Sequence, residues 1–479
     1  MNSIWTKTCT LEKRQPLEKK IETDVVVIGA GLAGILIAYH LQKSGKKVVV
    51  LEANTIGSGQ SSHTTGKLTF QHSGVYSSII KQYGQEIARQ YAEANQEAIK
   101  QYQQLIKEEQ MDCDLEEQNA YWYCDNAERL EEERFAMEQL AISYEYVRKA
   151  PVSIEMVGGL KVEHQAQFHP LKFIKALSRN LNIYEQSEVT QVEENEVFTK
   201  NGSVVASQIV FACHFPFINM PGMYFARMHQ ERSYVLALKN VKIDGMYLFD
   251  GKEHYSLRQY NNCVLLGGGN HRTGENKQGG KYEQLREKAR RWFPAGEEVA
   301  YWSAQDCMTL DKIPYIGVYA KTKPNWYVAT GFQKWGMTTS MVSALLLTDM
   351  ICGRKNPYEK IFTPERSIIQ NIPTLATEGG KAIKGLVKRV WNIPDSTAKE
   401  LKIGHGGVVS YEGEKIGVYK EDNGRVHMVT IQCPHLGCQL EWNPDEKTWD
   451  CPCHGSRFDY KGNCISNPAQ EGITIERIF

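Results

Sequence analysis

The sequence predicts an α/β Rossmann-like domain in the N-terminal part of the chain and a separate all-β domain at the C-terminus. Two observations support this prediction. A glycine-rich turn joins two β-branched segments near the N-terminus, and two short boxes of cysteine and histidine follow residue 430. At 479 residues the chain is long enough for about two to four domains, so a single small binding module is excluded.

Charge and composition exclude several classes of protein. Lys plus Arg and Asp plus Glu both number 56, so no global field attracts nucleic acid or an anionic membrane, and we expect no nucleic-acid partner. Hydrophobic residues make up 42% and charged residues 23%, which is ordinary for a globular protein. The 12 cysteines are too few for a disulfide scaffold, but five of them fall between Cys433 and Cys464.

The N-terminal segment mixes charged with polar side chains and lacks the apolar run of a secretory signal. The longest uncharged run, residues 25–42, contains three spaced glycines. It is better explained as a buried strand and the start of a helix than as a membrane span. We therefore expect a cytoplasmic protein without a transmembrane segment.

A complete βαβ unit begins at Asp24. Asp24–Ile28 is a continuous β-branched strand, an apolar helix follows to about Ser44, and Lys47–Leu51 forms the second strand. The turn after the first strand has the pattern GxGxxG, which lets a pyrophosphate approach the helix N-terminus through Gly29, Gly31 and Gly34. Glu52 follows the second strand, 23 residues after Gly29, where its carboxylate can accept both hydroxyls of an adenosine ribose. These features predict a dinucleotide site that disfavours a 2′-phosphate.

Two further segments favour a flavin as the ligand. Residues 57–67 are mostly small and would let the backbone pass close to a flat ring. Farther along, the strand Asn325–Ala329 leads through a glycine-containing turn into the apolar helix Met341–Ile351. A second helix N-terminus can stabilise negative charge on a reduced isoalloxazine. The polar segment 84–110, by contrast, is predicted to be a long helix on the solvated outside of the protein.

At these residues the chain resembles the FAD-dependent oxidoreductases of the D-amino-acid oxidase, glycine oxidase and sarcosine dehydrogenase superfamily, over about residues 22–360. Phe168–Pro170, Val189, Ser207–Ala212 and Asp311–Gly317 match the same superfamily. The resemblance implies an FAD-binding domain interleaved with a substrate domain, with FAD contacts from Gly29, Gly31, Gly34, Glu52, Ser61, His63, Lys67, Val189, Gly331, Gly336 and Met337. The sequence has no second βαβ unit with GxGxxG, so we expect no nicotinamide site.

His63 has two interpretations. In the sarcosine and dimethylglycine dehydrogenases of this superfamily, a histidine in a similar small-residue context is bonded covalently to the flavin. The oxidases of the same superfamily often carry arginine there and bind FAD non-covalently. We favour a loop histidine that only hydrogen-bonds the phosphate or the flavin, with covalent attachment as the alternative.

The two boxes near the C-terminus are the strongest chemical signal in the chain. Residues 433–438 read Cys-Pro-His-Leu-Gly-Cys and residues 451–456 read Cys-Pro-Cys-His-Gly-Ser, with 15 residues between His435 and Cys451. Two thiolates and two imidazoles can hold either zinc in a Cys2His2 site or a Rieske 2Fe-2S cluster. Zinc fingers place their two histidines together near a helix, whereas each box here pairs cysteine with one histidine and contains Gly and Pro suited to hairpin tips. The pattern favours the cluster.

From Leu401 to Ile475 the chain closely resembles a Rieske domain. The resemblance implies that two cysteines ligate one iron and two histidines the other, namely Cys433 and Cys451, and His435 and His454. It also matches Cys438 and Cys453 with a pair that forms a disulfide in Rieske proteins of cytochrome bc complexes. Reduced thiols are the alternative in a reducing cytoplasm.

Two nearby residues bear on the redox potential of such a cluster. Ser456 matches a hydroxyl that donates to a bridging sulfide, and Phe458 stands where the respiratory proteins carry a hydrogen-bonding tyrosine. Fewer hydrogen bonds to the sulfurs lower the potential, so we predict a value below the respiratory range. Only four residues follow Ile475, so we do not expect the mononuclear iron site that a Rieske oxygenase carries in a domain after its Rieske domain.

The predicted fold class is therefore an α/β Rossmann-like FAD-binding domain with an interleaved α+β substrate domain, followed by an all-β Rieske iron–sulfur domain. We expect the flavoprotein part at residues 22–365, a linker at 366–400 and the Rieske domain at 401–479. Within the linker, residues 379–391 have the pattern of a basic amphipathic helix. Such a helix either packs on its own domain or makes a peripheral membrane contact.

Together the two cofactors predict a converter between two-electron and one-electron chemistry. A flavin accepts two electrons as a hydride, whereas a Rieske cluster accepts one. We expect a dehydrogenase that oxidises a small substrate, by family resemblance an amine or N-methyl amino acid. The electrons would then pass singly to the cluster and on to an external electron-transfer protein or quinone. The alternatives are a flavin-dependent reductase that receives electrons through the cluster, and a non-catalytic electron-transfer or redox-sensing protein.

The substrate pocket is expected between three segments, Tyr224–Leu238, Tyr255–Arg258 and His271–Arg272. Arg258 and His271 are the candidate substrate-binding residues, Arg258 for a carboxylate. An ordinary surface ion pair is an equal interpretation of Arg258. The sequence identifies no catalytic base.

Overall fold

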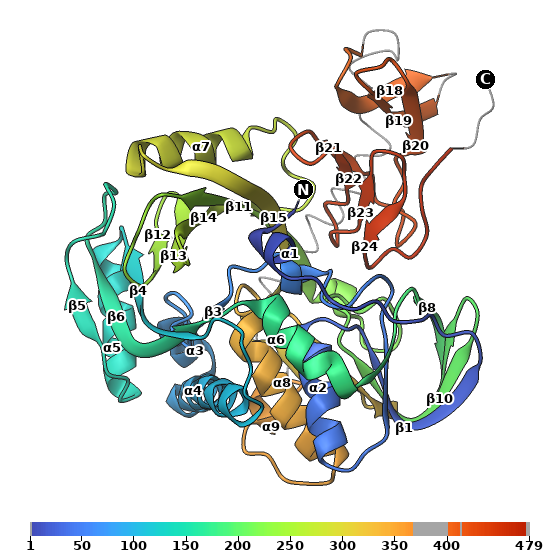
Figure 1. Cartoon of the computed structure of the whole chain (residues 1–479), viewed down its shortest axis with the longest axis horizontal. Coiled ribbons are helices and arrows are strands. Elements are labelled where there is room, and N and C mark those ends of the chain that lie inside the picture. Colours follow the sequence, from blue (N-terminus) through green and yellow to red (C-terminus); the bar gives the residue numbers. More distant parts are fainter. Residues whose placement is uncertain (1, 367–400, 412–413, 476–479) are drawn as a thin grey trace.

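The N-terminal part of the molecule, residues 2–366, contains two large β-sheets with helices packed on them, and the C-terminal domain lies against one of these sheets (Figure 1). The computed structural model describes residues 2–366, 401–411 and 414–475. The linker segment 379–391, for which an amphipathic helix is predicted, lies outside the described residues. Among the helices that the structure describes, none combines the length and apolar character needed to cross a membrane.

The first sheet carries the βαβ unit. Its strands run in the order β16-β17-β10-β1-β2-β7, and β8 and β9 extend it beside β10. β1 is parallel to β2 and to β10, and it begins four residues before the predicted strand because residues 20–23 pair with residues 203–206 of β10. The strands are β1 (Lys20–Ile28), β2 (Val48–Leu51), β7 (Asn182–Tyr184), β8 (Val189–Glu193), β9 (Glu196–Thr199), β10 (Ser203–Phe211), β16 (Tyr315–Ala320) and β17 (Lys323–Thr330).

Two apolar helices cover this sheet, α2 (Leu32–Lys43) and α8 (Gly336–Ile351), and they pack on each other. Helix α8 begins five residues before the predicted start at Met341. The polar residues there are buried within the helix because their hydroxyls donate back to backbone carbonyls, Ser340 to Gly336 and Ser343 to Thr339. A polar stretch therefore continues the helix instead of preceding it.

The second sheet is built from chain segments that alternate with those of the first, as the interleaved arrangement predicts. Its order is β15-β11-β14-β13-β12-β4-β6-β3, with β5 beside β6. Helix α7 (Lys281–Trp292) packs on β11 and β14. The strands are β3 (Lys67–Leu68), β4 (Glu116–Cys124), β5 (Glu145–Val147), β6 (Gly158–Gln167), β11 (Met228–Lys239), β12 (Met246–Asp250), β13 (His254–Tyr260), β14 (Cys263–Arg272) and β15 (Glu297–Thr309).

Helix α4 (Gln85–Glu108) corrects the expectation of a solvated outer helix. One face is buried against α8 and α3 (Tyr76–Tyr83), and it includes Tyr91, Ala98 and Tyr102. The other face carries the many Glu, Gln and Lys side chains. The overall polarity of the segment hid an apolar stripe of helical period made of alanine and tyrosine.

The remaining elements of the N-terminal part are short or lie at its edges. Helix α1 (Ile4–Thr8), before the predicted start of the domain, inserts Trp5 into the core, where the indole donates to the carbonyl of Thr64 at 2.7 Å. The other elements are α5 (Ala127–Gln139), α6 (Pro170–Leu177), α9 (Glu359–Phe362), η1 (Gln60–Ser62), η2 (Ser178–Asn180) and η3 (Tyr224–Ala226).

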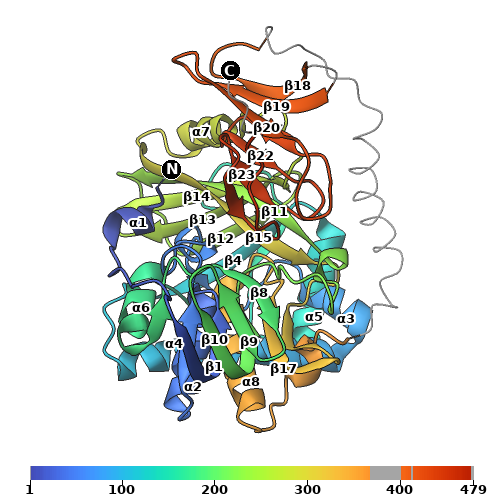
Figure 2. The same ribbon diagram turned by 90° about the vertical axis from the view of Figure 1, so that its right-hand side faces the viewer.

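The C-terminal domain (residues 401–475) is all-β, as predicted. It consists of a three-stranded sheet and a four-stranded sheet, both antiparallel, around a core that includes Trp449 and Phe458. The four-stranded sheet lies nearest the N-terminal part, beside β11 and β15 (Figure 2). The strands are β18 (Gly406–Tyr411), β19 (Glu414–Lys420), β20 (Val426–Thr430), β21 (Glu441–Asn443), β22 (Thr448–Asp450), β23 (Arg457–Asp459) and β24 (Cys464–Ser466).

Candidate functional site

A cavity of about 1030 Å³ is lined by both sheets of the N-terminal part and by the C-terminal domain. The contribution of the C-terminal domain is a single segment around β24, namely Cys464, Ile465, Ser466, Asn467, Ala469 and Gln470. Segments more than 400 residues apart in the sequence thus share one cavity.

The glycine-rich turn leaves no space for side chains. Gly29 has a φ of +105°, and a Cβ added to it would lie 2.6 Å from the carbonyl oxygen of Ala212. Gly34 lies beneath the turn, where a Cβ would approach the carbonyl oxygen of Gly29 to 1.9 Å. Gly31 lines the cavity at the start of α2. The backbone at the N-terminus of α2 is therefore open to an anionic ligand, as a pyrophosphate requires.

Glu52 is fixed at the end of β2 on the wall of the cavity. Its carboxylate accepts hydrogen bonds from the backbone N–H groups of Ala30 at 2.8 Å and Asn54 at 2.9 Å. Burial raises the pKa of Glu52 above its usual value, and these two hydrogen bonds act in the opposite direction. Val189 lines the same region of the cavity. The position suits a carboxylate that accepts from a ribose.

The small-residue loop brings three predicted residues to the cavity. Ser61 accepts a hydrogen bond from the N–H of Leu32 at 2.8 Å, which ties the loop to α2. His63 contacts its own loop, with Nδ1 2.8 Å from the carbonyl oxygen of Gly59, and burial lowers its pKa. Lys67 donates to the hydroxyl of Ser256, and burial, aided by the nearby charge of Arg258, lowers its pKa to about 7.

The second turn lies across the cavity. Gly331 has a φ of +71°, and a Cβ there would lie 2.3 Å from Cγ2 of Thr309. Gly336 and Met337 line the cavity at the first turn of α8, a 16-residue helix. Two helix N-termini, those of α2 and α8, therefore open onto one cavity, and both favour negative charge. This donor set fits FAD, with a pyrophosphate at α2 and a flavin at α8.

The cavity corrects two expectations about substrate binding. Arg258 is buried, and its guanidinium donates to the carbonyl oxygens of Thr65 and Gly66, both at 2.7 Å, and to that of Phe168 at 3.3 Å. Arg258 is not among the lining residues, because these carbonyls occupy its N–H groups, so its role is structural. Arg272 likewise turns away and donates to the carbonyl oxygens of Pro452 and Cys453 in the C-terminal domain.

His271 does line the cavity, as expected. Its ring stacks on Tyr234, with ring centroids 5.7 Å apart, and both ring nitrogens are buried without a hydrogen-bond partner. Burial lowers the pKa of His271 to about 4, so the imidazole is neutral at neutral pH. His271 is therefore placed to exchange a hydrogen bond with a molecule in the cavity.

The two cysteine and histidine boxes meet at the tip of the C-terminal domain. The side chains of Cys433 and Cys451 are hydrogen-bonded to each other, and this contact lowers the pKa of the Cys433 thiol. The Nδ1 atoms of His435 and His454 lie 3.2 Å apart, with ring centroids 4.9 Å apart. The donors thus form one sulfur pair and one nitrogen pair, the pairing that a Rieske cluster needs for its two irons.

A single zinc ion fits these residues less well. Its four ligands would have to converge on one point. In the part of the chain that the structure describes, the three side chains whose metal-binding atoms lie within 4.8 Å of one another are Cys438, Cys451 and Cys453. Cys438 and Cys453 are joined by a disulfide, the pair that the Rieske resemblance implies, so this set does not offer three thiolates. Ser456 is buried, hydrogen-bonds the Cys433 thiol and accepts from the N–H of Ala469.

The tip of the C-terminal domain faces the N-terminal part. Nε2 of His435 lies 2.7 Å from Oδ1 of Asn219, and Phe225 contacts the imidazoles of both His435 and His454 edge-on. Because an amide oxygen only accepts, His435 carries its proton on Nε2, which leaves Nδ1 free to ligate a metal. The sequence does not mark Asn219 or Phe225, because their partners lie more than 200 residues away.

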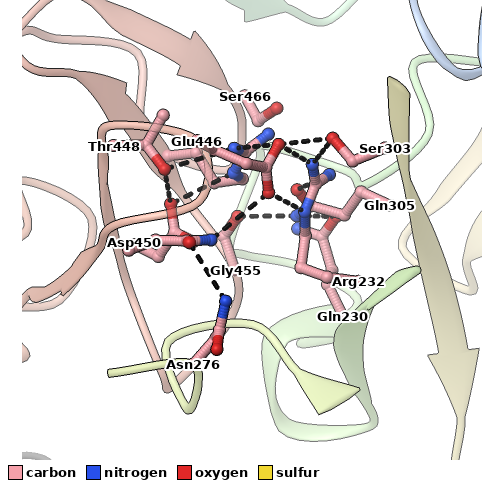
Figure 3. Close-up of polar contacts among 12 residues, drawn as sticks. Gln230, Arg232, Asn276, Ser303, Gln305, Glu446, Thr448, Asp450, Gly455 and Ser466 are labelled. Atoms are coloured by element: carbon pink, nitrogen blue, oxygen red, sulfur yellow. Dashed lines mark hydrogen bonds and ion pairs between the residues drawn. The ribbon is translucent and has the colours of Figure 1, made fainter. Parts of the chain in front are cut away.

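A buried polar network joins the two parts beside this tip (Figure 3). Arg232 on β11 forms an ion pair with Glu446, which also accepts from Ser303 and pairs with Arg457 at 3.0 Å. Asn276 donates to Asp445 at 2.9 Å. The C-terminal domain is therefore docked on the second sheet through charged and polar side chains, most of which are buried.

Comparisons with known proteins agree with both sites, the cavity in the N-terminal part and the cysteine and histidine boxes of the C-terminal domain. The sequence model of the family "FAD dependent oxidoreductase" matches residues 24–350, and that of the "Rieske [2Fe-2S] domain" matches residues 392–476. A Bacillus subtilis (strain 168) protein described as a Rieske 2Fe-2S iron-sulfur protein is 38% identical over 98% of this chain and 96% of its own length. Gamma-glutamylputrescine oxidoreductase of Escherichia coli (strain K12) is 26% identical, over 77% of this chain and 91% of its own.

Solved structures show the same fold for the N-terminal part. Glycine oxidase from Geobacillus kaustophilus superposes with a TM-score of 0.62 at 19% identity, covering 72% of this chain and 99% of that chain. L-proline dehydrogenase from P. horikoshii gives a TM-score of 0.61 at 17% identity, covering 73% of this chain and 98% of that chain.

Proposed function

Because this chain belongs to the FAD-dependent oxidoreductase family and ends in a Rieske [2Fe-2S] domain, we propose that it is a dehydrogenase for a small amine or N-methyl amino acid. In this proposal the electrons pass one at a time from FAD to the 2Fe-2S cluster and on to an external electron-transfer protein or quinone. The name of the Escherichia coli relative, gamma-glutamylputrescine oxidoreductase, supports an amine as the substrate class.

One observation carries the proposal: the cavity that fits FAD is lined partly by the C-terminal domain, next to the paired cysteines and histidines. When bound, FAD would accept a hydride from the substrate, and the cluster would carry single electrons. The residues of this chain would hold the two groups. The N-terminus of α2 would bind the pyrophosphate and Glu52 the ribose, and the N-terminus of α8 would offset negative charge on the flavin.

For the cluster, we assign Cys433 and Cys451 to one iron and His435 and His454 to the other. The Cys438–Cys453 disulfide braces the two loops. We assign His63 a non-covalent contact with FAD, from a loop in which its Nδ1 lies 2.8 Å from the carbonyl oxygen of Gly59. The division at residues 365 and 401 and a cytoplasmic location belong to the same proposal.

The test is anaerobic reduction. Candidate amines and N-methyl amino acids are added to the purified holoprotein while flavin absorbance and the EPR signal of the cluster are followed. We expect one of them to bleach the flavin and to produce the reduced cluster signal. A cluster-free His454→Ala variant serves as the control, because its flavin should still bleach while the cluster signal is missing.

The two alternatives give different results in this experiment. A reductase would be reduced by an external one-electron donor such as reduced ferredoxin, first at the cluster and then at the flavin, and amines would have no effect. A non-catalytic electron-transfer protein would accept electrons from a donor protein but from no small molecule. Either result would refute the proposed dehydrogenase.

A further inference from the structure

We propose that two buried glutamines, Gln230 on β11 and Gln305 on β15, are positioning residues that hold the cluster-binding loop against the FAD cavity and thereby set the rate of electron transfer between the two cofactors. This inference rests on the proposed function, in which both cofactors are present. It adds to that function a fixed route through two residues whose amides hydrogen-bond the backbone of the cluster-binding loop and not its metal-binding side chains.

The hydrogen bonds of the two glutamines cross the boundary between the parts, and Figure 3 shows those that link Gln230, Gln305 and Gly455. Nε2 of Gln230 donates to the carbonyl oxygen of His454 at 2.8 Å and to that of Asn467 at 3.1 Å. Nε2 of Gln305 donates to the carbonyl oxygen of Gly455 at 2.7 Å and to Oε1 of Gln230 at 2.6 Å. The loop that carries the candidate ligand His454 is thus held at two successive carbonyl groups.

On the side away from the C-terminal domain, Gln305 contacts the small-residue loop at residues 57–67, which is predicted to bind FAD. The backbone N–H of Gln305 donates to Oε1 of Gln60 at 2.7 Å, and Gln60 lines the cavity immediately before Ser61. Gln305 lines the cavity as well. A continuous series of hydrogen-bonded residues therefore runs from the FAD loop through Gln305 and Gln230 to the backbone of His454.

The orientation of both amides is determined by their partners. Each Nε2 faces two acceptors, so it must be the nitrogen and not the oxygen of the amide. Oε1 of Gln305 faces an N–H of Arg232 at 3.3 Å, and Oε1 of Gln230 faces Gln305. A glutamate at either position would set a carboxylate against backbone carbonyl oxygens, and an apolar side chain would leave buried carbonyls without a donor. Among side chains of this length, glutamine alone satisfies both requirements.

The packing around the pair leaves no tolerance for displacement. Gln230 is 1% exposed and Gln305 is 0% exposed. Gly455 has a φ of +83°, and a Cβ on it would lie 2.6 Å from Cβ of Gln230. The loop thus approaches β11 as closely as backbone allows, and the rate of electron tunnelling falls steeply as the distance between two centres grows.

The same interface supplies a matched control. Asn276 is also a buried amide, and it donates to Asn443 and Asp445 across the boundary. It also donates to the hydroxyl of Tyr234, which lines the cavity, but it makes no hydrogen bond to the loop of His454, to Gln230 or to Gln305. Asn276→Leu therefore removes interface hydrogen bonds, as Gln230→Leu and Gln305→Leu do, without touching the route between the two sites.

The experiment measures electron transfer within the full-length holoprotein, without a substrate. A light flash with an external photoreductant places one electron on the flavin, and the absorbance of the flavin and the cluster is followed as that electron moves to the oxidised cluster. In the unmodified protein we expect a first-order rate that is independent of protein concentration. Flavin content, cluster content and the EPR spectrum of the reduced cluster are measured for each variant.

We expect Gln230→Leu and Gln305→Leu to slow this transfer by more than twofold, because the loop of His454 loses the hydrogen bonds that hold it against β11. The rates are compared for protein molecules that hold both cofactors, the cluster spectrum should remain unchanged, and Asn276→Leu should transfer at the unmodified rate. Rates within twofold of the unmodified protein, or equal slowing in all three variants, would overturn the proposal. If a leucine variant loses its cluster, Gln230→Met and Gln305→Met are used, with the same expected outcomes. Since no amine is needed, this result stands apart from the test of the dehydrogenase.

Discussion

Replacing Glu446 by glutamine should weaken the attachment of the C-terminal domain, because Glu446 lies between two buried guanidinium groups. It pairs with Arg232 and with Arg457, and Arg457 also pairs with Asp450 at 3.1 Å. The side chains are 5%, 2%, 8% and 1% exposed in the order Glu446, Arg232, Arg457 and Asp450. The two positive and two negative charges of this group balance.

The magnitude follows from that balance. Glu446→Gln leaves one buried positive charge without a partner, and removing one member of a buried ion pair costs about 3–5 kcal/mol. With a urea dependence of about 2 kcal/mol per M, the unfolding midpoint of the C-terminal domain should fall by about 1.5–2.5 M. The assay is urea unfolding followed by the visible circular dichroism of the cluster, with flavin fluorescence as a separate probe of the N-terminal part.

A double variant tests whether charge balance is the cause. Arg232→Met alone leaves one unpaired negative charge, whereas Arg232→Met combined with Glu446→Gln leaves the neutral pair of Arg457 and Asp450. We expect the double variant to be more stable than either single variant. If the two losses of stability add, or if Glu446→Gln alone costs less than about 0.5 kcal/mol, the reasoning is refuted.

The stability of the C-terminal domain at acid pH should also depend on the ion pairs of Glu446. Burial on its own would raise the pKa of Glu446, but the guanidinium groups of Arg232 and Arg457 hold it well below the ordinary value of 4.5. A depressed pKa contributes stability above the pKa of the unfolded chain, and this contribution is lost as the pH falls toward the folded value. Below pH 4.5 the midpoint of the unmodified protein should therefore fall more steeply than that of Glu446→Gln.

Three further predictions concern the cofactor sites. Gly34→Val should abolish flavin absorbance in the purified protein, because a Cβ there would lie 1.9 Å from the carbonyl oxygen of Gly29, whereas Gly59→Ala, which meets nothing within 4 Å, should retain it. Phe458→Tyr should raise the midpoint potential of the cluster by about 60–130 mV, the equivalent of one hydrogen bond to a charged acceptor of about 1.5–3 kcal/mol, and an unchanged potential in a redox titration would contradict this. Acid precipitation should leave the flavin in the supernatant, since we assign His63 a non-covalent role, and a yellow pellet would indicate a covalent bond.

Much of the fold could be predicted because its signals are local. The βαβ unit combines β-branched strands, a glycine pattern and an acid at fixed spacing, and each of these is set within about 30 residues. The C-terminal boxes are equally local. The predicted start of α8 was wrong because polar residues are buried in its first turns. There the hydroxyl of Ser340 donates to the carbonyl oxygen of Gly336. The prediction that α4 is solvated on all sides was also wrong, because its apolar face is made of alanine and tyrosine among many charged residues.

The residues that join the two parts could not be predicted in the same way. Arg232 and Glu446 are 214 positions apart, and Gln230 is 224 positions from His454. Each is an ordinary polar residue of a strand or a turn, and only the docking of two folded domains makes it part of one network. Arg258 was predicted to bind substrate but has a structural role. Trp5 and the loop before β3 pack around its guanidinium, which donates to backbone carbonyls of that loop.

The interface also bears on how the two cofactor sites communicate. Asn219 and Phe225 cover the imidazoles at the tip of the C-terminal domain, and the glutamine pair holds the loop behind them. A domain that swung between two positions would have to expose Arg232, Glu446 and Arg457 at every turnover, and parting such a buried pair costs several kcal/mol. The docked arrangement needs no such movement, because the segment after β24 already lines the cavity in which the flavin would lie. Under the proposed function, we therefore expect electrons to pass between the two cofactor sites while the C-terminal domain stays docked, so that an external partner approaches the docked domain and not a released one.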